Sequence, residues 1–149
     1  MIRAIETKEN IKDILFNISM LAYAVSCILP CLTTRTEELI GYQCLLSGIF
    51  TIITDIRAFL IWSSNIYYIT IIVRLFKDKD VEIILPAISF LLSLGMIFHR
   101  YLNYDIEVPI TNFNIGYYLW VTSHLLLLVV CILKKSCALS SELSGRQYD

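Results

Sequence analysis

Long apolar runs separated by short charged segments make up most of this chain. Residues 14–32, 83–99 and 113–133 contain no Asp, Glu, Lys or Arg, and residues 39–76 form a longer apolar stretch with Asp55 and Arg57 near its middle. An α-helix needs about 20 apolar residues to cross about 30 Å of hydrocarbon. The pattern therefore predicts an all-α fold, an integral membrane bundle of transmembrane helices.

The stretch from residue 39 to residue 76 decides the topology. It is too long for one span, and a single span would place two charges in the bilayer at about 2.5–3.5 kcal/mol each. If residues 39–54 span the membrane, the chain crosses it five times. If they lie in the interface or re-enter on one side, the chain crosses it four times.

The distribution of the 12 Lys and Arg residues favours four crossings. With the N-terminus inside, four crossings leave only Arg35, Arg57 and Arg100 outside, a 9:3 split, whereas five crossings give 5:7 or 7:5. Lys and Arg concentrate on the cytoplasmic side of membrane proteins. We therefore expect a multi-pass inner-membrane protein with both termini in the cytoplasm. Its predicted segments are spans at about 14–32, 58–76, 81–99 and 113–133, an interfacial or re-entrant helix at about 37–54, and a disordered tail at 136–149.

Local signals predict where the helices begin. Thr34 and Glu37 have the spacing of a capping box, which would start the interfacial helix. Asp80 would cap the third span, and Thr111 or Asn112 would cap the fourth. Several aromatic residues fall toward the predicted outer interface and would form a belt there: Trp62, Tyr101, Tyr104, Tyr117, Tyr118 and Trp120.

The composition restricts the class of partner. With 57% hydrophobic and 17% charged residues, the 149-residue chain is too apolar for an ordinary soluble domain, and it has no basic patch for nucleic acid. The lipid bilayer is the expected partner, and another membrane protein or a second copy of the chain are further candidates. No cofactor is indicated.

His124 is the candidate for chemistry inside the membrane, because an ionisable side chain near mid-membrane is costly and often functional. The competing interpretation is a neutral histidine that bonds to a serine and holds two helices together, worth about 1 kcal/mol. Polar residues of the second and third spans lie at a similar depth. The predicted intramembrane polar cluster consists of His124, Ser63, Ser64, Asn65, Ser89 and Ser93.

Asp55 and Arg57 are predicted to lie at the outer interface. One interpretation is a helix cap beside an arginine that extends toward the headgroups. The other is an outward-facing polar site that Glu37, Glu38 or Asp105 would complete.

Cys31 and Cys44 also fall near the predicted outer face, where they could form a disulfide. The alternative, which applies to all five cysteines, is that each is a small hydrophobic side chain. The spacing of His99, Asp105 and Glu107 matches no established metal site, so no metal is predicted.

Three short segments resemble a group of uncharacterised small bacterial inner-membrane proteins. They are Gly41-Tyr42…Leu45-Leu46…Gly48, Trp62-Ser63-Ser64-Asn65 and Gly116-Tyr117-Tyr118-Leu119-Trp120. The similarity covers about two thirds of the chain. It implies four spans and an interfacial segment, and it implies no activity.

The sequence suggests three functions. The first is a non-enzymatic membrane protein that binds or modulates another membrane component. The second, a special form of the first, is an immunity protein against a pore-forming bacteriocin, suggested by architecture alone. The third is a small carrier or channel that uses His124 and residues 63–65. An enzyme is not expected, and no catalytic residue is predicted.

Overall fold

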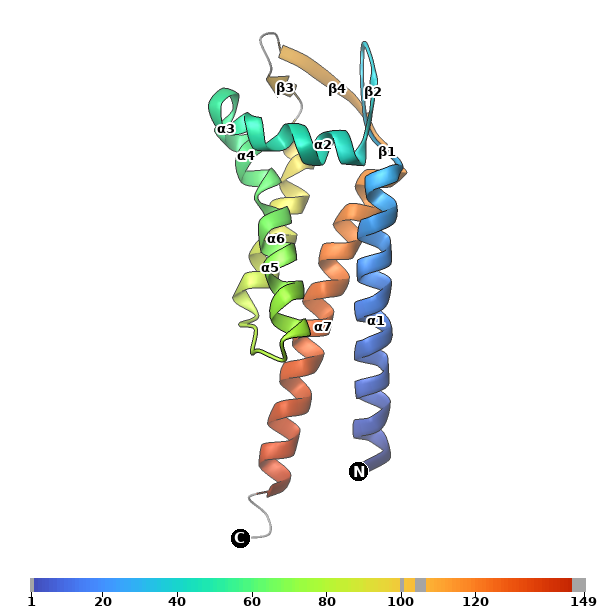
Figure 1. Cartoon of the computed structure of the whole chain (residues 1–149), viewed down its shortest axis with the longest axis vertical. Helices are drawn as coiled ribbons and strands as arrows, with labels where there is room; N and C mark the ends of the chain where they lie inside the picture. Colours follow the sequence, from blue (N-terminus) through green and yellow to red (C-terminus); the bar gives the residue numbers. More distant parts are fainter. Residues whose placement is uncertain (1, 100, 104–106, 146–149) are drawn as a thin grey trace.

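The computed structural model describes residues 2–99, 101–103 and 107–145, and these form a helical bundle with a small sheet at one end (Figure 1). The elements in chain order are α1 (Ile2–Ile28), β1 (Pro30–Thr34), β2 (Glu38–Ile40), α2 (Gly41–Ser47), η1 (Gly48–Phe50), α3 (Thr51–Thr54), α4 (Ile56–Trp62), α5 (Ser64–Phe76), α6 (Ile84–Leu94), η2 (Gly95–Phe98), β3 (Tyr101–Asn103), β4 (Glu107–Phe113) and α7 (Ile115–Gly145).

The two longest helices, α1 and α7, lie side by side, and both chain ends are at the end of the bundle opposite the sheet (Figure 1). Helices α4 and α5 follow one another along the bundle, and α6 packs against α5 and α7. In the described part of the chain, three segments are long and apolar enough to cross a membrane: Glu9–Ile28, Ile56–Phe76 and Ile115–Ala138. The apolar helices Gly41–Thr54 and Ile84–Phe98 are shorter.

A four-stranded antiparallel sheet corrects the all-α prediction. Its strand order is β2-β1-β4-β3, and Leu32 of β1 pairs with Phe113 of β4. Strand β1 follows α1 almost directly and β4 runs into α7, so the antiparallel helix pair continues as an antiparallel strand pair. The first predicted span therefore ends at Ile28 rather than at residue 32, because Pro30 has no backbone N–H for the helix ladder and begins a strand.

The predicted capping box at Thr34 and Glu37 is in fact the turn between β1 and β2. The Thr34 hydroxyl accepts from the Glu37 N–H at 3.1 Å, as in a capping box, but the Thr34 N–H also donates to the Glu37 carbonyl at 2.9 Å and closes a turn. The helix begins at Gly41 instead. There Gln43 Oε1 accepts from the Ile40 N–H at 2.8 Å.

Helix α2 lies across the end of the bundle rather than along it, and η1 and α3 continue from it to Asp55 (Figure 1). Here the predicted cap is confirmed. Asp55 Oδ1 accepts from the backbone N–H groups of Arg57 and Ala58 at 2.9 and 3.3 Å, and α4 begins at Ile56. The second predicted span is helical, and Ser63 separates its two helices, α4 and α5.

The starts of the last two bundle helices differ from the predictions. Asp80 caps nothing, because α6 begins four residues later, at Ile84. Thr111 and Asn112 lie in β4, and α7 begins at Ile115 after Asn114. Helix α7 also runs on to Gly145, so a disordered tail from residue 136 is wrong, and residues 146–149 lie outside the described ones. Residues 136–145 include Ala and Leu, which favour helix and extend the apolar helix before them.

Candidate functional site

Asn65, in the first turn of α5, joins three helices. Its Oδ1 accepts from the Tyr23 hydroxyl of α1 at 2.9 Å and from the Trp120 indole N–H of α7 at 2.8 Å. Its Nδ2 donates to the Trp62 carbonyl at 2.9 Å. The side-chain carbonyl has two lone pairs, so these two donors use both of them.

His124 of α7 is 1% exposed and bonds to Ser89 of α6, at 2.8 Å between Nδ1 and Oγ. The Ser89 hydroxyl also donates to the Ser64 carbonyl, at 3.1 Å. A hydroxyl has one proton to donate, so Ser89 accepts from His124 and the imidazole proton is on Nδ1. Among the described residues, Nε2 has no hydrogen-bond partner. This arrangement favours a neutral histidine that links two helices.

Aromatic rings surround this imidazole. The ring centroids of Tyr68 and Trp120 lie 4.8 and 5.2 Å from that of His124, and Tyr23 stacks on Tyr68 at 4.4 Å. Two aromatic rings therefore pack against the imidazole.

The other predicted members of the cluster have separate partners. Ser63 donates to the Leu60 carbonyl and Ser93 to the Phe90 carbonyl, each one turn back along its own helix. The Ser64 hydroxyl has no partner among the described residues. Of the predicted serines, Ser89 is thus the one that the structure brings to His124.

Sequence reasoning missed a second polar contact, between α1, α5 and α7. Ser19 is 0% exposed and donates to the Ser123 carbonyl at 2.8 Å, and the Tyr68 hydroxyl donates to the Ser19 carbonyl at 3.0 Å. Each of the three is a polar residue inside an apolar run, which is the signal that could have found them. Polar residues inside a helix bundle serve as contacts between helices.

Asp55 has a second contact besides the helix cap. Its Oδ2 lies 3.1 Å from Nε2 of His99, the residue directly after η2, and both side chains are largely buried. Arg57 is exposed, and Glu38 accepts from Asn114 at 2.9 Å. The outward-facing polar site of Asp55 and Arg57 with Glu37, Glu38 or Asp105 stays a prediction. Asp105 lies outside the described residues.

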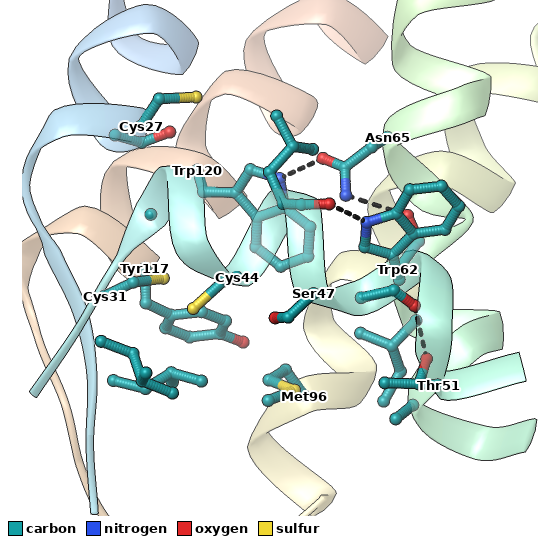
Figure 2. A pocket seen from close by; sticks show the side chains of 18 of the residues that line it. Cys27, Cys31, Cys44, Ser47, Thr51, Trp62, Asn65, Met96, Tyr117 and Trp120 are labelled. Carbon is teal, nitrogen blue, oxygen red and sulfur yellow. Dashed lines mark hydrogen bonds between the residues drawn. The ribbon is translucent and has the colours of Figure 1, made fainter. Parts of the chain in front are cut away.

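A cavity of about 100 Å³ lies beneath α2 (Figure 2). Four aromatic side chains, Tyr23, Trp62, Tyr117 and Trp120, form much of its wall, together with Asn65. Tyr117 is 1% exposed, and the Trp62 indole N–H donates to the Leu45 carbonyl of α2 at 2.8 Å. Trp62, Tyr117 and Trp120 therefore point into the protein instead of forming the predicted interfacial belt, and Tyr104, another predicted member, lies outside the described residues. Tyr101 and Tyr118 are exposed.

Four sulfur-containing residues also line this cavity: Cys27, Cys31, Cys44 and Met96. Cys31 and Cys44 pack in one apolar cluster at the sheet end, where their side chains interact with each other. The hydrogen bond between them lowers the pKa of Cys44. The same bond, together with burial, raises the pKa of Cys31. All five cysteines are free thiols in this structure, so the predicted disulfide is not formed in it.

Comparison of the chain with protein-family models, with curated proteins and with solved structures gave no match. The resemblance to small bacterial inner-membrane proteins stays a prediction. Within residues 2–99, 101–103 and 107–145, no group of three or more His, Cys, Asp or Glu side chains could hold a metal ion. The cavity and the polar contacts beside it are the candidate site.

Proposed function

We propose that this chain is a non-enzymatic, multi-pass inner-membrane protein whose cavity beneath α2 binds a small apolar molecule from the membrane. The observation that carries this proposal is the cavity itself, of about 100 Å³, with four aromatic walls and a helix lying over it. The proposal includes four crossings and cytoplasmic termini.

The fourth crossing would be made by α6 and η2, which are shorter than a usual span. The 3₁₀ segment rises about 2.0 Å per residue instead of 1.5 Å, which lengthens the crossing. The segment formed by α6 and η2 begins and ends level with the segment formed by α4 and α5. At the end of η2, His99 contacts Asp55, which precedes α4. At the start of α6, Leu85 follows the turn that joins α5 to α6.

Charge supports the orientation. Lys134 of α7 lies 3.5 Å from the Lys79 carbonyl in the turn after α5, and Arg74 is in the last turn of that helix. The turn between α5 and α6 lies away from the sheet, on the side toward which the start of α1 and the end of α7 extend (Figure 1). Basic residues concentrate on the cytoplasmic side, so this end would be cytoplasmic and the sheet would face outward.

The lining of the cavity determines the class of ligand. The polar atoms of Asn65 and Trp62 already bond within the protein, so the wall offers mainly aromatic and apolar contact. An apolar cavity of about 150 Å³ stays dry and binds benzene. A ligand about the size of one ring, stacked on the aromatic walls, fits this cavity with a small displacement of α2.

Tryptophan fluorescence tests this function, because both tryptophans of the chain line the cavity. Bromobenzene, a ring-sized heavy-atom quencher, is titrated against the full chain in lipid nanodiscs. We expect saturable quenching above the linear background from bromobenzene dissolved in the lipid. Ala58→Leu, which fills the cavity, removes the saturable component.

Ala24→Leu is the matched control, because Ala24 is exposed on α1 and is not part of the cavity wall. Bromobenzene is expected to quench the tryptophan fluorescence of this variant as it does that of the unmodified chain. Purely linear quenching of the unmodified chain, or identical curves for both leucine variants, would contradict the proposed binding.

The two other functions receive less support. A carrier would need a route to His124, which is 1% exposed and does not belong to the cavity wall. Immunity against a pore-forming bacteriocin is one form of binding to a membrane component, and it rests on the four-span architecture alone.

A further inference from the structure

The cavity is closed by an element that is weakly attached. All seven residues of α2 are described, and none of them is fully buried. Its attachments include the Gly41 N–H bond to the Leu29 carbonyl, at 3.0 Å, and the bond that Leu45 accepts from Trp62. Segments with few buried contacts open locally at low free-energy cost. Helix α2 is therefore the part of the wall best able to move.

Two thiols meet where this helix crosses β1. Cys31 of β1 is 8% exposed, and Cys44 of α2 is partly exposed and packs in the same cluster. Both side chains line the cavity, and Figure 2 shows their sulfur atoms directed toward one another. A disulfide here would join the moving helix to the sheet.

We propose that Cys31 and Cys44 are a redox-active thiol pair whose oxidation to a disulfide fixes α2 over the cavity and restricts ligand entry. The effect on ligand entry rests on the function proposed above, whereas formation of the disulfide does not. The oxidant is a disulfide of low molecular weight, or a disulfide oxidoreductase, on the outer side of the membrane.

The reaction is two successive thiol–disulfide exchanges. The Cys44 thiolate attacks one sulfur of the donor disulfide, whose S–S bond breaks and releases the first donor thiolate. Cys31 then loses its proton and attacks the Cys44 sulfur of the mixed disulfide, which releases the second donor thiolate. Two electrons pass to the donor, and the two protons of the protein thiols end on the two donor thiols.

The order of attack follows from accessibility and charge. Cys44 is the more exposed of the two, and its hydrogen bond with Cys31 lowers its pKa. The thiolate is the attacking species in such exchanges. Cys31 is deeper and reacts second, within the protein.

The remaining thiols provide controls. Cys27 also lines the cavity and is the alternative partner. Cys131 lies in the core cluster with Tyr68 and Leu127, away from α2. Cys137 is near the other end of α7, beyond Lys135, and is replaced by serine throughout to remove background alkylation.

The test uses the full chain in nanodiscs, treated with oxidised glutathione, alkylated and mapped by peptide mass spectrometry. We expect one cross-link, between Cys31 and Cys44, in the parent chain and in Cys27→Ser. It is absent from Cys31→Ser and Cys44→Ser, whose helical circular dichroism should match that of the parent. Free thiols at both positions after oxidation, or a cross-link through Cys27, would overturn the thiol pair.

The second measurement is the rate at which bromobenzene quenches the tryptophans, before and after oxidation. We expect entry to be about tenfold slower in the oxidised chain, because local opening of α2 is then prevented, and unchanged by oxidation in Cys44→Ser. If binding is saturable but oxidation does not slow it, the disulfide does not restrict ligand entry, and this part of the proposal is wrong. Disulfide formation without saturable binding to either form would contradict the proposed function and leave the thiol pair intact.

Discussion

The indole N–H of Trp120 donates to Oδ1 of Asn65 at 2.8 Å, and this bond joins α7 to α5 beside the cavity. The Tyr23 hydroxyl of α1 donates to the same oxygen at 2.9 Å. One amide therefore satisfies donors from two neighbouring helices. Trp120 in turn forms part of the cavity wall, so its orientation depends on this amide.

Asn65→Leu is expected to lower the free energy of unfolding by about 2–4 kcal/mol, because each buried donor left without an acceptor costs about 1–3 kcal/mol. Asn17→Leu is the control, since Asn17 is exposed on α1. The measurement is chemical unfolding in detergent, followed by circular dichroism. Equal stability of the two variants would contradict the role of Asn65 as a junction.

Replacements of His124 separate a structural role from a proton-carrying one. Asparagine places an amide N–H near the position of Nδ1, which bonds to Ser89, whereas glutamine places one near Nε2, which has no partner among the described residues. We expect His124→Asn to retain most of the stability and His124→Ala to lose about 1 kcal/mol, the value typical of one hydrogen bond between helices.

Glutamine gives the contrast for this pair of variants. His124→Gln should be less stable than His124→Asn, as measured by thermal unfolding in detergent. If both amides instead unfold at the temperature of His124→Ala, the bond to Ser89 is not what stabilises this position.

The sequence was informative where one residue determines the local structure. Asp55 caps a helix whatever surrounds it, because its carboxylate bonds to N–H groups two and three residues on. His124 and Ser89 could be paired by depth, since polar side chains inside apolar helices bond to each other. The long apolar helices likewise follow from runs of apolar residues.

The sheet could not be predicted in the same way. The bond from the Glu37 N–H to the Thr34 hydroxyl occurs both in a helix cap and in the turn between β1 and β2, so residue spacing does not distinguish them. Pairing of β1 with β4 joins residues about 80 positions apart, such as Leu32 and Phe113. Such a pairing depends on α1 and α7 lying side by side, which no local pattern encodes.

The cavity was not predictable either, because its wall comes from several separate elements. Their depth alone predicts a belt position for Trp62 and Trp120, but depth does not determine which way an indole points. Their hydrogen bonds to Leu45 and Asn65 turn them inward.

Gly41 is required where α2 crosses the end of α1. A Cβ at this position would lie far inside contact distance of the Ser26 carbonyl oxygen, which is backbone and cannot rotate away. Gly41→Ala is therefore expected to destabilise the protein by about 1–3 kcal/mol, as overpacking typically does. The measurement is the unfolding midpoint, with Ser47→Ala, also in α2, as the control. A Gly41→Ala variant as stable as this control would rule out the close approach of α2 to α1.

A pair of variants separates the helix cap of Asp55 from its contact with His99. Asparagine is as good a helix cap as aspartate, whereas alanine loses the cap at a cost of about 0.5–2 kcal/mol. We expect Asp55→Asn to stay near the stability of the parent in thermal unfolding and Asp55→Ala to fall by that amount. A loss of equal size in both would assign the contribution of Asp55 to its charge beside His99, 3.1 Å away, rather than to the cap.

The four-crossing topology predicts on which side of the membrane single cysteines react. In a chain whose native cysteines are serine, Arg57→Cys is expected to react with an impermeant maleimide added to cells with a permeabilised outer membrane. Lys79→Cys should react only after the inner membrane is broken. Both residues are exposed, so a difference between them reports the side and not burial. Protection of residue 57 in unbroken cells would place Asp55 and Arg57 in the cytoplasm. The helix from Gly41 to Thr54 would then have to cross the membrane, even though it lies across the end of the bundle.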